Sequence, residues 1–377
     1  MKLVEFVPPT PHPLWKLCPQ MGITDVIVKV NPDLTGLPDP WRYETLASIV
    51  ARLKSAGLNV VGLEGDPFDM SPIKEYGADT GTTGVPPVAV NGQDARCPST
   101  FNGQDARCPS GREEALEHYR ELLESMGRLG IKLLCYNFMV GKGWSRTGVR
   151  EGRGGAKATY FSTKVGEKSS SSRKECPISN SNSILQLNAS QVWANYEHFI
   201  KSVMPTAEKC GVRMGLHPDD PCLPSLGGYA RIFGSVEAYD RAYALYPSPS
   251  NAVTFCQANF KLMLEPPTPT QTPKHSNTQT LEDVARHFGR RIAFIHVRDV
   301  EGTKEDFTEL FHDQGDVDQF ALMRVYRELG LDVPVRGDHV PEMAYDRELT
   351  QDGTPGYFTL GRLFANGYLK ALLKGLG

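Results

Sequence analysis

Four residues whose side chains commonly bind metal ions recur at regular intervals in the second half of the sequence. They are His217 in MGLHPDDP, Cys256 in VTFCQAN, His296 in AFIHVRD and Asp338 in VRGDHV, spaced 39, 40 and 42 residues apart. Each ends a short apolar run that is typical of a β-strand. Two imidazoles, a thiolate and a carboxylate suit a divalent transition metal and disfavour magnesium. The sequence therefore predicts a metal site with positions left open for substrate oxygens.

Structural zinc binding and ordinary packing are the alternatives for such residues. A single His or Cys at a strand end is more often packed or hydrogen-bonded than bound to metal. Structural zinc sites usually draw their cysteines from closely spaced pairs, whereas these four residues come from distant segments. Their regular succession favours a shared reactive site. Cys97 and Cys108, in the repeated nonapeptide NGQDARCPS at 91–99 and 102–110, lack a second ligand pair for a zinc clip.

Further polar residues directly follow the candidate ligands. Asp219 and Asp220 come after His217, and each can either orient the imidazole through its other nitrogen or cap the next helix. Arg298 follows His296 and can clamp a substrate carboxylate with both guanidinium nitrogens or pair with Asp299, and we favour the clamp.

Short apolar runs alternate with longer segments of helical period, which is the pattern of a parallel sheet with crossover helices. The predicted strands are 3–7, 25–30, 60–64, 132–137, 213–217, 252–256, 292–297 and 333–338. The predicted helices are 43–56, 112–129, 189–209, 236–245, 281–288, 317–329 and 357–373. An open doubly wound sheet also satisfies this alternation. The strand count favours a closed (β/α)8 TIM barrel, whose strand ends would bring the four candidate ligands to one mouth.

Three segments rich in Gly, Pro, Ser, Thr or Asn interrupt this pattern, at 77–110, 152–183 and 265–280. We interpret them as loop insertions in a single α/β barrel domain that covers residues 1–377. The first contains the nonapeptide repeat, which has too few copies for a solenoid. It is expected to be a flexible insertion without a catalytic part, the alternative being a lid or contact surface.

Composition points to a protein that acts on small molecules. The chain of 377 residues is 40% hydrophobic and 23% charged, with a net charge of −3, so it carries no basic field for nucleic acid. It has no run of about 18 apolar residues for a membrane span. The N-terminus lacks the features of an export signal, and eight cysteines in such a length do not suggest a disulfide framework. We expect a cytoplasmic protein with reduced thiols.

Several motifs together resemble the mannonate dehydratase family of xylose-isomerase-like barrels. They are LEGDP at 63–67, LLCYNFM at 133–139, WSRTG at 144–148, HPDDP at 217–221, HVRDV at 296–300, GDVD at 315–318, GDH at 337–339 and PGY at 355–357. The resemblance implies a hydro-lyase that converts D-mannonate to 2-keto-3-deoxy-D-gluconate and water. It implies Mn²⁺ on the four candidate ligands, although Fe²⁺, Co²⁺ or Zn²⁺ would also suit a thiolate. It further implies a homo-oligomer.

The resemblance also implies roles for other residues. His339 and Tyr357 would lie near the reacting carbons, one removing the C2 proton and the other protonating the leaving C3 hydroxyl, in an order that the sequence leaves open. Asn137, Trp144 and Arg146 would line the substrate pocket.

This sequence departs from the family pattern at a few positions. Asp69 stands where the family tends to carry His, Asp299 where Asn is usual, Gly337 where Pro is usual and Val340 where Gly is usual. A different aldonate is therefore an alternative substrate. A barrel isomerase or epimerase is the alternative enzyme, and a non-catalytic sugar-acid binding protein is the least favoured function.

Overall fold

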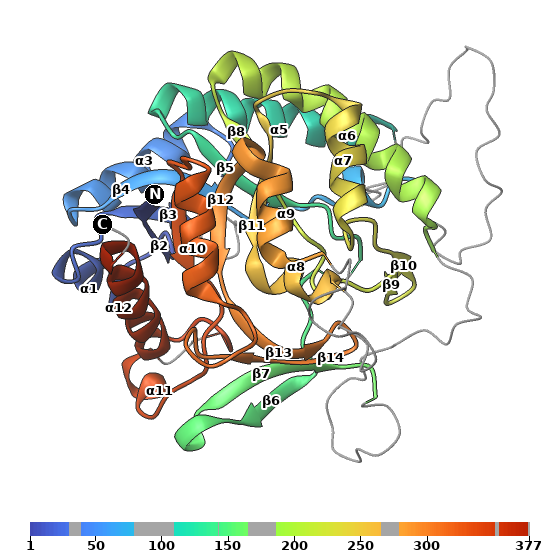
Figure 1. Cartoon of the computed structure of the whole chain (residues 1–377). Coiled ribbons are helices and arrows are strands. Elements are labelled where there is room, and N and C mark those ends of the chain that lie inside the picture. Colours follow the sequence, from blue (N-terminus) through green and yellow to red (C-terminus); the bar gives the residue numbers. More distant parts are fainter. Residues whose placement is uncertain are drawn as a thin grey trace, which may run out of the picture.

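A closed parallel sheet forms the centre of this computed structural model (Figure 1). Its strands join in the order β1-β15-β12-β11-β8-β5-β4-β3-β2. They are β1 (Lys2–Leu3), β2 (Glu5–Val7), β3 (Asp25–Val28), β4 (Asn59–Glu64), β5 (Leu133–Asn137), β8 (Arg213–His217), β11 (Asn251–Cys256), β12 (Ile292–Val297) and β15 (Pro334–Gly337). Only Val4 separates β1, which pairs with β15, from β2, which pairs with β3, so the sheet closes on itself. The predicted TIM barrel is confirmed, with its first strand split in two.

The structure describes residues 1–29, 39–78, 109–141, 143–164, 186–264, 279–350 and 354–375. Most of the first predicted insertion, 77–110, lies outside the described residues, and so does almost all of its repeated nonapeptide. Residues 77 and 78 are described at its start. At its end, the backbone of residues 109 and 110 begins helix α5 (Pro109–Leu129). The third, 265–280, is described only at its last two residues, where Thr280 caps helix α9 (Leu281–Phe288).

Helices surround the barrel (Figure 1). Those that match predictions are α5 and α9 together with α3 (Tyr43–Ser55), α6 (Ala189–Cys210), α7 (Val236–Leu245), α10 (Gln319–Glu328) and α12 (Thr359–Gly375). Strands of a parallel sheet are covered on both faces, and every residue of β3 and β12 is buried. The shorter helices α1 (Leu14–Gln20), α4 (Ser71–Lys74), α8 (Gln257–Met263) and α11 (Asp346–Leu349) were not predicted.

Local sequence sets the ends of the long helix α6. The side chain of Asn188 accepts a hydrogen bond from the Gln191 backbone N–H, and the side chain of Gln191 accepts one from the Asn188 backbone N–H. This capping box satisfies backbone donors that the first helical turn leaves free. Gly211 ends the helix at φ 64°, a left-handed conformation that glycine adopts without a Cβ penalty. The chain then enters β8, which carries His217.

A second sheet covers the end of the barrel where the strands terminate. It is antiparallel, with the order β13-β14-β7-β6, and consists of β6 (Gly148–Glu151), β7 (Lys157–Ser162), β13 (Asp299–Thr303) and β14 (Asp306–Leu310). Strand β13 begins directly after β12, so this antiparallel sheet lies at the carboxyl end of the barrel (Figure 1). The first part of the predicted insertion at 152–183 contains β7 and is thus not an irregular loop, but it still lies between the barrel strand β5 and helix α6. Residues 165–185 lie outside the described residues.

Two expectations from composition can be compared with the described residues. No helix among them is both long and apolar enough to cross a bilayer. The described cysteines, namely Cys18, Cys135, Cys210, Cys222 and Cys256, are free thiols.

Candidate active site

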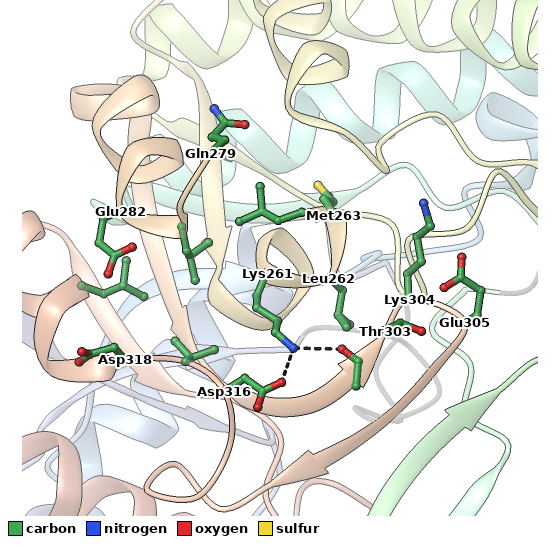
Figure 2. Close-up of a pocket in the computed structure, with 15 residues that line it drawn as sticks. Lys261, Leu262, Met263, Gln279, Glu282, Thr303, Lys304, Glu305, Asp316 and Asp318 are labelled. Atoms are coloured by element: carbon green, nitrogen blue, oxygen red, sulfur yellow. Dashed lines mark hydrogen bonds and ion pairs between the residues drawn. The ribbon is translucent and has the colours of Figure 1, made fainter. Parts of the chain in front are cut away.

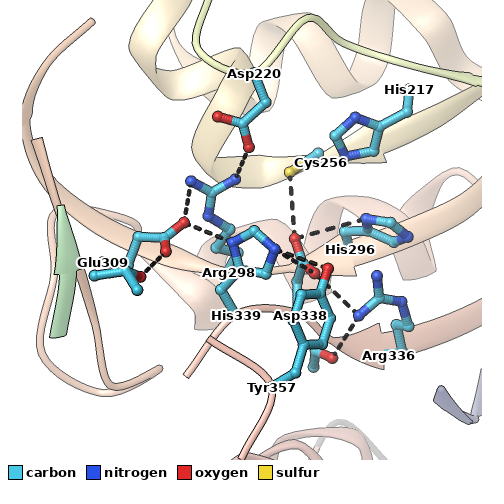
Figure 3. A network of polar contacts seen from close by, with 12 residues as sticks. His217, Asp220, Cys256, His296, Arg298, Glu309, Arg336, Asp338, His339 and Tyr357 are labelled. Atoms are coloured by element: carbon cyan, nitrogen blue, oxygen red, sulfur yellow. Dashed lines mark hydrogen bonds and ion pairs between the residues drawn. The ribbon is translucent and has the colours of Figure 1, made fainter. Parts of the chain in front are cut away.

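The four candidate metal ligands come together at the mouth of the barrel. His217, Cys256 and His296 lie at the carboxyl ends of β8, β11 and β12, and Asp338 directly follows β15. These four strands are neighbours in the sheet. One donor atom from each residue lies within 4.8 Å of the others, and all the side chains except the half-buried His217 are buried (Figure 3). The geometry is that of a potential four-donor metal site.

The protonation and pairing of these donors fit a divalent cation. Both ring nitrogens of His296 are buried and have no hydrogen-bond partner among the described residues. Burial and the neighbouring His296 lower the pKa of His217 to about 4, so its imidazole is neutral and can donate a lone pair. Burial raises the pKa of Cys256 to about 12, so its thiolate needs a positive charge close by. A bound divalent cation would supply that charge and a partner for His296.

Glu64 and Arg336 form an ion pair beside this cluster that was not predicted. Arg336, on β15, donates from Nη2 and Nε to the Glu64 carboxylate at 2.6 and 3.1 Å. Its Nη1 lies 3.0 Å from Asp338 Oδ1. The Glu64 carboxylate in turn lies 3.5 Å from His296 Nε2, while His296 Nδ1 faces Asp338 at 3.8 Å. Glu64 is therefore placed to orient the His296 ring from the side opposite the candidate metal site.

Glu64 also belongs to a second group of possible donors, with Cys135 and His296. Burial works to raise the pKa of Glu64, but Arg336 and His296 outweigh it and hold the pKa at about 2. The carboxylate is thus already neutralised by a guanidinium. Arg336 occupies both oxygens of Glu64 but only Oδ1 of Asp338, whose Oδ2 faces His296 Nδ1 and Cys256 Sγ, so the structure favours the group around Asp338 as the metal site.

We expect Glu64→Gln to weaken metal binding by roughly 10–100-fold, the usual effect of removing a carboxylate behind a ligating histidine. The cause would be loss of the charge and orientation that Glu64 gives to His296. A chelator competition titration measures the affinity. Glu44→Gln, at an exposed position in the first turn of α3, is the matched control. Equal affinities in the two variants would show that Glu64 does not support the ligand.

His339 and Tyr357 form a hydrogen-bonded pair next to the four donors. His339 Nε2 lies 2.8 Å from the Tyr357 hydroxyl oxygen and 3.7 Å from Asp338 Oδ1. On its other side, His339 Nδ1 lies 2.6 Å from Glu309 Oε1 (Figure 3). Burial and the charge of Asp338 raise the pKa of Tyr357 well above its usual value, so the phenol keeps its proton. The pair can therefore accept and donate protons beside the candidate metal site.

Glu309 was not predicted as a site residue. It lies on β14 of the antiparallel sheet and is completely buried. The segment DFTEL at 306–310 contains the β-favouring residues Phe307 and Thr308 but no strict alternation of apolar and polar residues, so its pattern is a weak strand signal. That pattern does not reveal which residue of the barrel the strand faces, because the contact with His339 spans separate elements.

Arg146 and Arg298 alternate with Asp220 and Glu309 in a buried ring of charges. Arg146 donates to both oxygens of Asp220, at 2.7 and 2.8 Å, and to Glu309 at 2.6 Å. Arg298 donates to Asp220 at 2.8 Å and also pairs with Glu309. Burial works to raise the pKa of Asp220, but the two arginines hold it at about 2. The pKa of Glu309 is likewise held well below its usual value.

This ring changes the interpretation of Arg298 and Arg146. Arg298 does not pair with Asp299, whose carboxylate instead accepts from the backbone N–H groups of Val300, Gly315 and Val317. Both arginines are directed at protein carboxylates. In this arrangement they position the site around His339, and their proposed contact with substrate remains a prediction.

Asp219 and Asp220 take neither of the two roles considered for them. His217 Nδ1 faces the Pro218 carbonyl oxygen at 2.8 Å rather than a carboxylate. Asp219 accepts from the backbone N–H of Phe233 at 2.7 Å, which fixes the loop after β8 and caps no helix. Asp220 belongs to the charge ring. The expectation that either carboxylate orients the imidazole was wrong, because the chain turns both away from His217.

Asn137 and Trp144 lie on different sides of the mouth. Asn137 ends β5, next to His217 on β8, and accepts a hydrogen bond from the buried Lys74 at 3.0 Å. The Trp144 ring lies edge-on to His339 at 5.2 Å between centroids and is 37% exposed. Trp144 can therefore form a wall of a substrate pocket, as the sequence predicts.

A surface pocket of about 890 Å³ lies away from this cluster (Figure 2). Lys261, Lys304 and Asp316 are among its lining residues, and none of the candidate metal donors lines it. Leu264 and Gln279 border the pocket, and residues 265–278 between them lie outside the described residues. The volume and lining of the pocket therefore refer to the described residues only. Among the described residues, this pocket is therefore separate from the candidate metal site.

The closed parallel barrel has the fold of the xylose-isomerase-like TIM barrels, with four potential metal donors at its strand ends. Solved structures of low sequence identity share this fold. A xylose isomerase domain protein from Planctomyces limnophilus matches at a TM-score of 0.52 and 13% identity, covering 99% of this chain and 95% of that one. The IOLI protein with a bound zinc atom matches at 0.54 and 12% identity, covering 100% and 99%.

The family model for D-mannonate dehydratase (UxuA) matches residues 105–377. The mannonate dehydratase of Streptococcus equi subsp. zooepidemicus is 29% identical over 287 residues, which cover 71% of this chain and 74% of the relative. The structure of mannonate dehydratase from Streptococcus suis serotype 2 has the same fold, with a TM-score of 0.74 and 23% identity over 100% of this chain and 93% of that one. The chain belongs to the D-mannonate dehydratase family, whose members are hydro-lyases.

Proposed function

We propose that this protein dehydrates D-mannonate to 2-keto-3-deoxy-D-gluconate in a reaction that depends on a divalent metal. The observation that carries the proposal is the contact between two groups at the barrel mouth. The proton-transfer pair of His339 and Tyr357 lies directly beside the four donors, with His339 Nε2 at 3.7 Å from the candidate ligand Asp338. Membership of the family supports the same reaction.

His217, Cys256, His296 and Asp338 would hold the metal. When bound there, a divalent cation supplies Lewis acidity that stabilises the negative charge developing on the substrate as the C2 proton leaves. We propose Mn²⁺ from the family resemblance, whereas Fe²⁺, Co²⁺ and Zn²⁺ also suit this mixed sulfur, nitrogen and oxygen set.

The pair of His339 and Tyr357 would move the two protons of the reaction. One group takes the proton from C2, and the other gives a proton to the C3 hydroxyl, which leaves as water while the C2–C3 double bond forms. The resulting enol then becomes the 2-keto acid. The hydrogen bond of 2.8 Å between His339 and Tyr357 keeps the two groups close enough to serve adjacent carbons. The Trp144 ring, which lies edge-on to His339, would shield the imidazole from water.

Three of the four departures from the family pattern, at Asp69, Asp299 and Gly337, favour an unchanged substrate. Asp69 is exposed and accepts hydrogen bonds from Ser71, at the start of α4. Gly337 faces α12, where an added Cβ would lie 3.1 Å from the Ala365 side chain. Asp299 binds backbone N–H groups. These positions contact protein scaffold rather than the pair at the mouth, which supports D-mannonate as substrate.

The test is a product assay with purified protein that has been stripped of metal and reloaded with Mn²⁺. We expect D-mannonate to give a 2-keto-3-deoxy acid, identified by NMR and by colorimetric detection, and we expect the stripped protein to give none. Other aldonates, such as D-gluconate, serve as the comparison panel. Product from another aldonate alone would retain the reaction and change the substrate. Failure to dehydrate any aldonate, with turnover of a keto sugar, would favour an isomerase or epimerase instead.

A further inference from the structure

We infer that Glu309 is a positioning residue that fixes which nitrogen of His339 carries the proton. This inference rests on the proposed role of His339 as a proton-transfer group. Glu309 Oε1 lies 2.6 Å from His339 Nδ1, and His339 Nε2 lies 2.8 Å from the Tyr357 hydroxyl oxygen. The imidazole is therefore held between a carboxylate and a phenol (Figure 3). Each of its nitrogens has one hydrogen-bond partner at short range, and the Asp338 carboxylate lies further from Nε2, at 3.7 Å.

The charges around Glu309 determine what it can do for His339. Arg146 and Arg298 both bind its carboxylate, and all three side chains are almost completely buried. Two buried guanidinium groups stabilise the ionised carboxylate, and an ionised carboxylate can only accept hydrogen bonds. His339 Nδ1 must then carry a proton in order to donate to Glu309.

The proton on Nδ1 also determines the state of the second ring nitrogen of His339, Nε2. When the ring carries a single proton, Glu309 holds that proton on Nδ1 and Nε2 has the lone pair. The Tyr357 hydroxyl then donates to Nε2. Glu309 thus sets His339 to accept a proton at the nitrogen that faces the reaction, and sets Tyr357 to donate one.

The antiparallel sheet is what brings Glu309 to this position. Strand β14 pairs with β13 on one side and β7 on the other. The hydroxyl of Thr159, on β7, donates to the second carboxylate oxygen, Oε2. Together with the two arginines, this contact holds the carboxylate plane in one orientation towards His339. The sheet, which lies outside the barrel strands, thereby supplies a group that acts on the barrel-mouth chemistry.

The first test uses the wild-type protein and requires no activity. Nitrogen NMR of ¹⁵N-histidine-labelled protein, loaded with diamagnetic Zn²⁺, reports which ring nitrogen is protonated, and the His339→Asn spectrum assigns the signal. The spectrum is read at a pH at which the His339 ring carries a single proton, and we expect that proton on Nδ1. A single proton on Nε2 would overturn the inference.

The second test uses variants at the same position. Glu309→Gln replaces a pure acceptor with an amide that can also donate, so part of the His339 population should move its proton to Nε2. We expect kcat to fall on the order of 10²–10⁴-fold, the range of acid–base catalysis, with KM little changed. Glu309→Asp, which retains an acceptor, should recover part of kcat. Glu301→Gln, at an exposed position on β13, is the matched control.

These readouts separate the inference from the proposed function. If no aldonate is dehydrated but His339 carries its proton on Nδ1, the role of Glu309 stands and the proposed reaction fails. The opposite outcome would be that the wild-type protein dehydrates D-mannonate and that the Glu309→Gln variant, folded and loaded with metal, keeps both the wild-type His339 protonation and the wild-type kcat. In that case the proposed reaction stands and the inference about Glu309 fails. Metal content and circular dichroism confirm that each variant is folded.

Discussion

The Cys256→Ser variant is expected to lose bound metal and dehydratase activity together. A serine hydroxyl stays protonated at neutral pH, so the substitution removes the anionic sulfur from a set of four donors. The activity should fall by about 10³-fold or more, because Lewis-acid stabilisation contributes several kcal/mol and 1.36 kcal/mol corresponds to a factor of ten. Metal analysis after dialysis against Mn²⁺, together with the product assay, measures both effects.

Two other cysteines provide controls for this experiment. Cys210 ends α6 and is half-buried, so Cys210→Ser should keep metal and activity. Cys135 belongs to the second possible donor group, with Glu64, and Cys135→Ser should keep its metal if Arg336 excludes a cation there. Full metal content in Cys256→Ser, or its loss in Cys135→Ser alone, would contradict the assigned ligand set.

His339→Asn is expected to keep its metal and lose turnover. The asparagine amide can still bond to Glu309, so the buried network is retained, but it lacks the Nε2 that faces Tyr357. We expect kcat to fall on the order of 10²–10⁴-fold, as for removal of a general acid or base. Metal analysis and steady-state kinetics with D-mannonate separate the two outcomes.

The matched control for this variant is His198→Asn. His198 lies on α6 at the surface, where it pairs with Glu113, so its loss should change neither metal content nor kcat. Tyr357→Phe removes the hydroxyl that contacts His339 Nε2 and should also lower kcat while metal is retained. Wild-type turnover in His339→Asn would place the proton-transfer role on another residue.

The barrel and its candidate metal donors could be predicted because they depend on local patterns. Parallel strands that are buried on both faces require short apolar runs, and the barrel strands appear as such runs in the sequence. Barrel strands also end on the same side, so a donor after each of four successive runs had to reach one mouth. The regular spacing of the four donors therefore predicted that they meet in space. The structure brings one donor atom from each of them close enough to hold one ion, namely from His217, Cys256, His296 and Asp338.

The antiparallel sheet was harder to recognise, because its strands are separated in the chain. Strand β7 lies within a segment rich in glycine, and its partner β14 is about 150 residues further on, as the contact between Thr159 and Glu309 shows. The pairing depends on loops that leave the barrel from β5 and β12 and meet above its mouth. No local pattern in the chain specifies such a meeting.

The sequence by itself therefore determined the barrel, the set of possible metal donors and the family resemblance that selected His339 and Tyr357. Only the tertiary structure decided which charges surround them. It directed Arg146 and Arg298 to Asp220 and Glu309, turned Asp219 away from His217, and placed Glu64 behind His296. The physical reason is that a buried charge must find an opposite charge in its own surroundings. Those surroundings are assembled from distant segments, so residue type and spacing along the chain do not identify the partner.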